Sequence, residues 1–218
     1  MFTMIKTCLC VLFITCLSGC YSQAVHQVKK GKTMVLFNGS NLDHWEGDKK
    51  LWHIERGELV AGDTTIEQPE NDFLCTKKEY KNYILRLKFK LEGSRGWVNS
   101  GVQLHSQRSQ SPPLFEMIGY QAEMANPCWG CIYDESRRKE YLITADHNIM
   151  DSVIHKGNWN DYEIRCIGRR IVILLNGVQA VDYTEPQNEY PSFGKIAVQI
   201  HSKGYTKISF REILLQQF

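Results

Sequence analysis

Residues 83–91 read Tyr-Ile-Leu-Arg-Leu-Lys-Phe-Lys-Leu, a stretch in which apolar and charged side chains alternate. Successive side chains of a β-strand point to opposite faces of its sheet. One face of this stretch would carry Tyr83, Leu85, Leu87, Phe89 and Leu91, and the other would carry Arg86, Lys88 and Lys90. The pattern predicts a strand with one face in the core and one face in water.

The same period of two recurs along the chain, with turn signals between the runs and no sustained helical spacing of three and four residues. Residues 171–175 are apolar on both faces, which is typical of a central strand. Asn176-Gly177 follows them and predicts a tight hairpin, and Arg56-Gly57 predicts another turn. We therefore predict an all-β domain in which about ten strands form two stacked antiparallel sheets, a jelly-roll sandwich.

The N-terminal residues have the features of an exported protein. Lys6 precedes an apolar run over residues 8–17, and small residues stand directly before Cys20. The run is shorter than the roughly 20 residues of a membrane-spanning helix. We interpret residues 1–19 as a signal peptide whose end resembles the lipobox of bacterial lipoproteins, which would make Cys20 the lipidated first residue. The alternative is an ordinary secretory signal that is cut nearby, with Cys20 incidental.

The predicted organisation is a single domain on a lipid anchor. Residues 20–32 are polar, as expected of a flexible tether, and residues 33–218 show no repeat and no second composition regime, which predicts one domain. The protein would be exported and lipid-anchored to a bacterial cell membrane, in the periplasm or at the outer-membrane surface.

The charge balance argues against a nucleic-acid partner. The chain has 26 Lys and Arg and 24 Asp and Glu, a net charge of +2. Removing residues 1–19 takes away only Lys6, so 25 basic and 24 acidic residues remain and the net charge becomes +1. An electrostatic nucleic-acid binder would carry a basic excess.

Four cysteines lie in the predicted domain: Cys75, Cys128, Cys131 and Cys166. An exported compartment permits disulfides, so Cys128 and Cys131 could pair with each other or with the other two. A thioredoxin-type motif would need a βαβ unit and a four-cysteine zinc site would usually show two close pairs, so both are disfavoured. Buried free thiols are an equally favoured alternative, because Cys166 alternates with apolar neighbours.

Three predicted strands carry uncharged or titratable hydrogen-bonding groups on one face. These groups are Gln103 and His105, Gln121 and Glu123, and Gln199 and His201. Outer faces usually carry long charged side chains instead, so a merely solvated face is the less favoured alternative. Amide, imidazole and carboxyl groups match sugar hydroxyls, and Trp97, Trp129 and Tyr133 could supply flat apolar platforms. The pattern favours a carbohydrate-binding face.

The segment between residues 125 and 141 directly follows the strand with Glu123. Its aromatic and charged residues include Trp129, Tyr133, Asp134, Glu135, Arg137 and Arg138. Because arginine can clamp an oxygen-rich ligand, we expect this loop to form the rim of the active site.

Motifs spread over nearly the whole domain carry a family resemblance. They include Leu36-Phe37-Asn38-Gly39, Asn99-Ser100-Gly101-Val102-Gln103, Gly119-Tyr120-Gln121-Ala122-Glu123, Trp159-Asn160-Asp161-Tyr162-Glu163-Ile164, Leu175-Asn176-Gly177-Val178 and Gln199-Ile200-His201. Each motif alone is weak, but their order and spacing are specific. The chain resembles the 3-keto-disaccharide hydrolase domain, also described as a 3-keto-glucoside lyase and hydratase domain, which has a concanavalin A-like fold.

The resemblance implies action on sugars oxidised at C3. The ketone acidifies the C2 hydrogen, so a base can remove it, the glycosidic oxygen leaves C1 by β-elimination, and hydration completes a formal hydrolysis. This chemistry needs a base, an acid and donors for the enolate oxygen. We expect His201 or Glu123 to be the base, and the other, or His105, to be the acid. The expected substrate-binding residues are Asn99, Gln103, Gln121, Gln199, Trp129, Tyr133, Glu135 and Arg137.

Two other functions stay open. An ordinary glycosidase needs two positioned carboxylates, and the sequence lacks the Glu-x-Asp-x-Glu run of sandwich glucanases. A lectin-like binding module is the non-catalytic alternative, since a fold does not fix a function. No cofactor is predicted, although His105, His201 and the acids could bind a divalent metal. The expected partners are an oligosaccharide or glycoside substrate and the membrane that holds the lipid.

Overall fold

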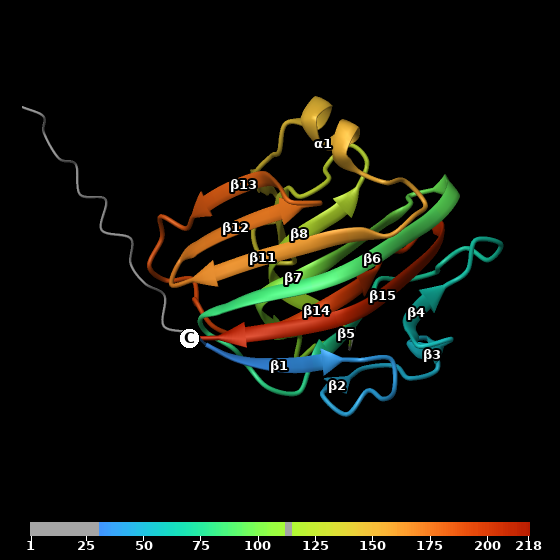
Figure 1. The fold of residues 1–218 in the computed structure, drawn as a ribbon, viewed down its shortest axis with the longest axis horizontal. Coiled ribbons are helices and arrows are strands. Elements are labelled where there is room, and N and C mark those ends of the chain that lie inside the picture. The colour runs from blue at the N-terminus through green and yellow to red at the C-terminus, as the bar shows by residue number, and fades with distance from the viewer. Residues whose placement is uncertain (1–30, 112–114) are drawn as a thin grey trace, which may run out of the picture.

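The computed structural model describes residues 31–111 and 115–218, which form two stacked antiparallel β-sheets (Figure 1). The predicted all-β sandwich is therefore confirmed. The proposed signal peptide (1–19), the lipidation site Cys20 and all but the last two residues of the tether (20–32) lie outside the described residues. Among the described residues, no helix combines the length and hydropathy that crossing a membrane requires.

The first sheet has eight strands, with the predicted strand at residues 83–91 in its middle. Its spatial order is β13 (Val178–Thr184), β12 (Arg170–Leu175), β11 (Asn160–Ile167), β6 (Tyr83–Gly96), β15 (Gly204–Gln217), β4 (Glu58–Gly62) and β3 (His53–Glu55), and β1 (Lys32–Phe37) also pairs with β15. Along β6, Leu85 and Leu87 are buried while Arg86 between them is exposed. The predicted alternation is confirmed.

The second sheet has seven strands and lies behind the first in Figure 1. Its order is β10 (Tyr141–Ile143), β9 (Ile132–Glu135), β8 (Met117–Ala125), β7 (Asn99–Arg108), β14 (Lys195–Ile200), β5 (Asp72–Thr76) and β2 (Trp45–Glu46). The short helix α1 (His147–Val153) connects this sheet to β11 of the first. The Asp146 side chain caps the helix by accepting from the N–H groups of Asn148 and Ile149.

Two of the predicted turns have the geometry that tight hairpins require. Asn176 and Gly177 join β12 to β13 with φ of 49° and 83°, and Arg56 and Gly57 join β3 to β4 with φ of 51° and 80°. Positive φ at both central residues matches the right-handed twist of the flanking strands. The sequence therefore specifies the register of these two hairpins locally.

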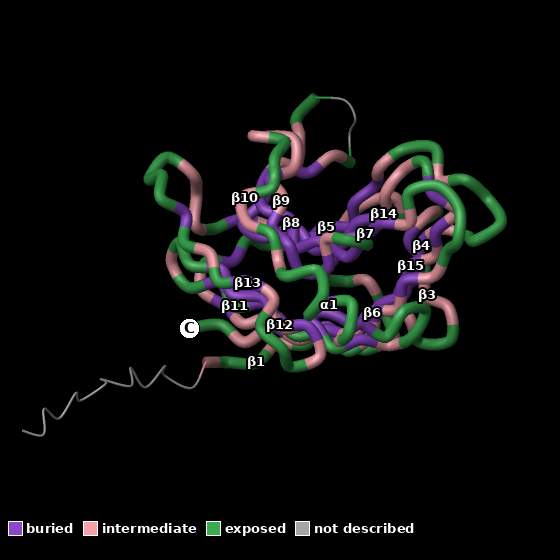
Figure 2. The backbone as a smooth tube through the Cα atoms, turned by 90° about the horizontal axis from the view of Figure 1, so that it is seen from above, coloured by how far each residue is buried: buried purple, intermediate pink, exposed green. Residues whose placement is uncertain are grey.

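The core lies between the two layers, where buried segments run along the strands of both sheets (Figure 2). Its largest fully buried side chains include Trp45, Trp52, Tyr162, Phe89 and Phe210. The Trp45 indole donates to the carbonyl of Leu36 at 2.8 Å. The Tyr162 hydroxyl of β11 donates to the carbonyl of Glu123 in β8 at 3.1 Å, so this contact joins the two sheets. These two rings thus keep their polar atoms partnered inside the core.

An ion cluster fastens the two sheets at one edge. Arg138, which follows β9, pairs with Asp134 of β9 and, at 2.7 Å, with Glu185, which follows β13. Tyr120 and Tyr183 donate their hydroxyls to Glu185 at 2.9 and 3.0 Å. Burial alone would raise the pKa of Glu185, but the donors around it lower this pKa to about 2. The buried carboxylate therefore stays charged and holds Arg138.

We expect Glu185→Gln to destabilise the protein by about 3 kcal/mol at pH 7, because Arg138 loses one of its two buried carboxylate partners. The pKa of Glu185 is lower in the folded state than its ordinary 4.5. The contribution of the Glu185 carboxylate to the free energy of unfolding is therefore complete above pH 4.5, and it is lost as the pH falls through about 2. Urea unfolding of both proteins from pH 7 to pH 3 should show their difference shrinking.

The matched control is Glu189→Gln, at an exposed position of the same loop. Equal free energies of unfolding at pH 7 for the wild type and Glu185→Gln would contradict the role of the ion cluster.

Candidate active site

The second sheet carries a row of amides on the face that points away from the core. Gln103 of β7, Gln121 of β8 and Gln199 of β14 are almost completely buried. Gln121 accepts a hydrogen bond from Gln103 at 2.7 Å and donates to Glu123 and Gln199 at 2.9 and 3.0 Å. Strand alternation predicted that these side chains share a face, and the structure brings all of them into one network.

A glycine in β7 makes room for the central amide of this network. Gly101 pairs with Glu123 on one side and with Gln199 on the other. A Cβ atom at position 101 would lie 2.7 Å from Cγ and Cδ of Gln121, which is closer than real contacts allow. Any larger residue at this position would displace Gln121 and break the network.

Next to the network is a cavity of about 220 Å³. Its walls are formed by Trp97, Asn99, Gln121, Glu123, Tyr133, Glu135, Tyr141 and His201. These residues come from β7, β8, β9, β10 and the loops before β7 and after β14. The structure thus places most of the sequence-predicted site residues around one enclosed space.

Three buried polar atoms in and beside the cavity make no hydrogen bond of standard geometry with the described residues, although the Asn99 and Gln199 amides lie close enough to the Glu123 and Glu135 carboxyls to oppose the rise in pKa that burial causes there. The three atoms are Asn99 Oδ1, Glu123 Oε2 and Gln199 Nε2. A buried polar atom left unpaired costs about 1–3 kcal/mol. Two oxygens and an amide nitrogen would be satisfied together by a ligand that offers both donors and acceptors, as a polyhydroxylated sugar does. Of all the cavity's features, this one points most directly to a polar ligand.

The two carboxyl groups of the cavity hold protons more tightly than usual. Burial raises the pKa of Glu123 to about 7, although the Gln121 amide opposes the shift. Burial, reinforced by the negative charges of Glu116 and Glu123, raises the pKa of Glu135 to about 8. Raised pKa values of this size at a cavity are typical of acids that exchange protons near neutral pH.

His201 lies just after β14, and its ring has a defined tautomer. Its Nδ1 is 2.7 Å from the carbonyl oxygen of Ser202. A carbonyl can only accept, so Nδ1 carries the hydrogen and Nε2 is the free nitrogen of the neutral ring. Burial lowers the pKa of His201 below its ordinary 6.5, so the ring is neutral at pH 7. His201 can therefore accept a proton on Nε2.

Aromatic rings form the remaining walls. The Trp97 indole stacks on His201 with ring centres 5.5 Å apart and planes 15° apart, and Tyr133 meets Tyr141 edge-on at 5.1 Å. Sequence reasoning missed Tyr141, because its place depends on β10 folding back against β9. Trp97 was predicted only as a nearby aromatic platform, and the structure places its ring against the imidazole of His201.

His105 and Gln103 do not line the cavity. A β-bulge shifts the register of β7 after Leu104, and His105 has a φ of 48°. Its Nε2 contacts the carbonyl of Lys81 at 2.8 Å, so the expected acid role of His105 has no geometric basis. Gln103 lies behind Gln121 and supports it without bordering the cavity.

Trp129 and Arg137 also lie away from the cavity, contrary to the predicted substrate contacts. The Trp129 ring is buried and stacks on Phe89 of the first sheet at 6.5 Å. Arg137 donates to both oxygens of Asp134 at 2.9 and 3.0 Å. Asp134 lies between two cavity residues of β9, so strand alternation turns it and Arg137 to the opposite face.

Cys75, Cys128, Cys131 and Cys166 are free thiols, which is one of the two alternatives that the sequence left open. Burial raises the pKa of Cys131 and Cys166 to about 12, so both remain protonated. Within the described ranges, no three His, Cys, Asp or Glu side chains gather as the ligands of a metal ion would.

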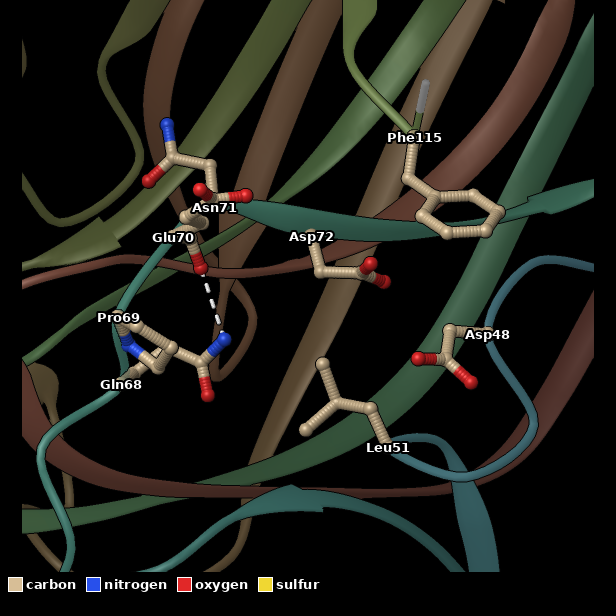
Figure 3. A pocket seen from close by; sticks show the side chains of 8 residues that line it. All are labelled: Asp48, Leu51, Gln68, Pro69, Glu70, Asn71, Asp72 and Phe115. Atoms are coloured by element: carbon tan, nitrogen blue, oxygen red, sulfur yellow. Dashed lines mark hydrogen bonds between the residues drawn. The ribbon is translucent and has the colours of Figure 1, made fainter. Parts of the chain in front are cut away.

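A larger cavity, of about 540 Å³, lies where Asp48, Asp72 and Phe115 face one another (Figure 3). Its buried acid, Asp72, accepts a hydrogen bond from Trp52 Nε1 at 2.6 Å, and burial raises its pKa to about 6. None of the described residues of its wall carries a buried polar atom without a partner. The smaller cavity is therefore the stronger candidate active site.

Solved structures share the fold at low sequence identity. A putative glycosyl hydrolase from Parabacteroides distasonis ATCC 8503 is 19% identical, with a TM-score of 0.63 over 86% of this chain and 94% of that one. A second from the same organism is 24% identical, with a TM-score of 0.61 over 86% and 100%. The carbohydrate-binding module CBM66 from Bacillus subtilis is 10% identical, with a TM-score of 0.60 over 84% and 99%.

A comparison of the sequence with curated proteins gives no match. The model of one protein family, described as a 3-keto-alpha-glucoside-1,2-lyase-like domain, matches residues 32–216. The match includes every strand of both sheets and every residue of the small cavity. This chain therefore belongs to the family of 3-keto-alpha-glucoside-1,2-lyase-like domains.

Proposed function

We propose that the protein is a carbohydrate-active enzyme that cleaves 3-keto glycosides by β-elimination across C1 and C2. One observation carries the proposal: an imidazole with a free nitrogen and two carboxyls of raised pKa line the same cavity. Elimination requires a base and an acid at one substrate, and His201, Glu123 and Glu135 can supply both. The family match supports the substrate class.

The volume of the cavity supports a single sugar ring as the reacting part. Its 220 Å³ is below the roughly 300–1,000 Å³ of sites for drug-sized ligands. Asn99 Oδ1 and Glu123 Oε2 belong to residues that line the cavity, and they would bond the ring hydroxyls or the ketone. The substituent at C1 must then extend out of the cavity.

The reaction would begin with His201. Its Nε2 takes the proton from C2, and the electron pair moves onto the C3 oxygen as an enolate. The pair then returns to form the C1=C2 double bond, and the C1–O bond breaks. The leaving oxygen takes a proton from Glu123, so an alcohol and a 1,2-unsaturated 3-keto sugar are formed. Hydration would reverse the roles, with Glu123 activating water for attack on C1 and His201 returning its proton to C2.

Glu135 would stabilise the enolate. Because its pKa is about 8, its carboxyl is mostly protonated at pH 7 and can donate a hydrogen bond. A donor that is already in place when charge develops on the C3 oxygen lowers the barrier, and the buried surroundings strengthen its effect. The sequence indicated a substrate-binding role for Glu135, and its proposed role deepens that prediction.

A lectin-like module would use the same cavity without chemistry. Such a module needs hydroxyl-binding groups, but it needs neither a neutral imidazole with a free nitrogen nor protonated acids beside it. These groups therefore favour the enzyme. Binding of 3-keto-glucosides by the wild type without any product would favour the module instead.

We expect His201→Ala to reduce kcat for a methyl 3-keto-glucoside by about 10²–10⁴-fold, because the variant lacks the group that removes the C2 proton. Product formation is followed by mass spectrometry. His44→Ala, which changes an exposed histidine, should retain wild-type turnover. A His201→Ala variant that is folded and fully active would reject the assigned base.

We expect the logarithm of kcat/KM to rise with pH until the pH passes the pKa of His201, below 6.5. It should then fall with slope −1 above about pH 7 as Glu123 loses its proton, and with slope −2 above about pH 8 as Glu135 does too. In Glu135→Gln the new side-chain amide can donate a hydrogen bond but does not titrate. The slope of the profile should therefore stay at −1 above about pH 8 as well. A flat wild-type profile from pH 7 to 9 would contradict both acid roles.

A further inference from the structure

Trp97 borders a second cavity as well as the candidate active site. The second cavity has a volume of about 450 Å³ and is lined by Gly96, Trp97, Val98, Asn126 and Pro127. The indole is 58% exposed, while one of its faces stacks on His201. The ring therefore lies between the polar cavity of the candidate active site and a second, less polar cavity.

A third cavity, of about 420 Å³, continues from the second. It shares Val98 and Asn126 with the second cavity and adds Leu91, Trp129 and Lys156 among its walls. The shared residues stand at the start of β7 and just after the end of β8. We call the second and third cavities together the leaving-group groove. It runs from Trp97 around the ends of these two strands.

The groove differs in chemistry from the active-site cavity. Val98, Pro127 and Leu91 give the groove an apolar floor. The active-site cavity, by contrast, is lined by aromatic rings and by amide, carboxyl and imidazole groups. The polar side chains in the walls of the groove are Glu92, Asn126 and Lys156. An apolar floor with few polar groups is typical of a site for an aromatic or aliphatic ring.

The inner wall of the groove also contains an unpaired donor. Trp129 is only 6% exposed, and its indole Nε1 has no hydrogen-bond partner among the described residues. A buried N–H without a partner is costly unless a ligand oxygen accepts from it. Trp129 was predicted from the sequence as a substrate contact, and it lies in the wall of the groove instead of the wall of the active-site cavity.

We propose that the leaving-group groove binds the C1 substituent of the glycoside and that it selects an aryl aglycone carrying an oxygen acceptor. The inference rests on the proposed function, because a sugar held in the active-site cavity must direct its C1 oxygen outward. Trp97 stands at the exit and offers a flat surface to an aromatic ring. The apolar floor then favours an aryl ring over a second sugar, whose hydroxyls would lose water there without enough partners.

The test uses the full chain and three substrates: methyl, 4-methoxyphenyl and glucosyl 3-keto-glucosides. We expect the wild type to have a KM about tenfold lower for the aryl than for the methyl substrate, because the ring is partly buried in the groove. Val98→Lys, which places a charge on the groove floor, should remove this difference and leave the methyl substrate unaffected. Val178→Lys, at an exposed valine of β13, is the matched control.

Three results would overturn the proposal. Equal KM values for methyl and aryl substrates would show that the groove is unused. A preference for the glucosyl substrate over the aryl one would show that the leaving group is a sugar. An equal rise in KM for all substrates in Val98→Lys would show that the substitution acts through the active-site cavity.

A binding measurement separates this proposal from the proposed function. Methyl and 4-methoxyphenyl glucosides that are not oxidised at C3 can be titrated by calorimetry, with no turnover required. Selective aryl binding that Val98→Lys abolishes would support the groove even if no 3-keto substrate is cleaved. Trp129→Phe, which keeps an aromatic ring but lacks the N–H, should weaken 4-methoxyphenyl binding severalfold and leave phenyl binding unchanged. If Trp129→Phe weakens the binding of the 4-methoxyphenyl glucoside and of the phenyl glucoside to the same extent, the indole N–H is excluded as a donor to the methoxy oxygen.

Discussion

The candidate active site depends on one primary amide that uses both of its N–H donors and its carbonyl oxygen. The oxygen of Gln121 accepts from Gln103, and its nitrogen donates to both Glu123 and Gln199. Glu123 is thereby fixed through one oxygen and keeps the other free for a ligand. The partners come from three neighbouring strands, so the antiparallel register sets the geometry, and the space left by Gly101 allows it.

A polar layer buried this deeply is tolerable because it carries little net charge. The amides are neutral, burial raises the pKa of Glu123 and Glu135 so that they hold protons, and burial lowers the pKa of His201 so that it does not. The desolvation that suppresses charge also leaves acids and a base side by side, ready to exchange protons. On the opposite face of β9 the groups are charged: Arg138 pairs there with the carboxylates of Asp134 and Glu185.

The two hairpins were predictable from their turn residues, Asn176-Gly177 and Arg56-Gly57. The sandwich and the amide row were predictable because alternation by two is a property of the extended backbone alone. The same rule failed at His105, since a β-bulge adds a residue that no count of alternating side chains reveals. The composition of residues 125–141 was a weaker guide. It indicated Tyr133, which lines the cavity, but also Arg137, whose ion pair with Asp134 holds it away from the cavity. Tyr141 carried no local signal, because pairing between β9 and β10 brings it to the cavity.

The imidazole of the cavity is supported by a segment that takes no part in the cavity itself. The Asn71 side chain accepts a hydrogen bond from the backbone N–H of Ser202, next to His201. Gln68 adds two backbone bonds, one to Lys203 and one to Gly204. This segment precedes His201 by more than half the length of the domain. Insertions or deletions near Asn71 during evolution would therefore move the imidazole of His201 while every residue that lines the cavity stayed the same.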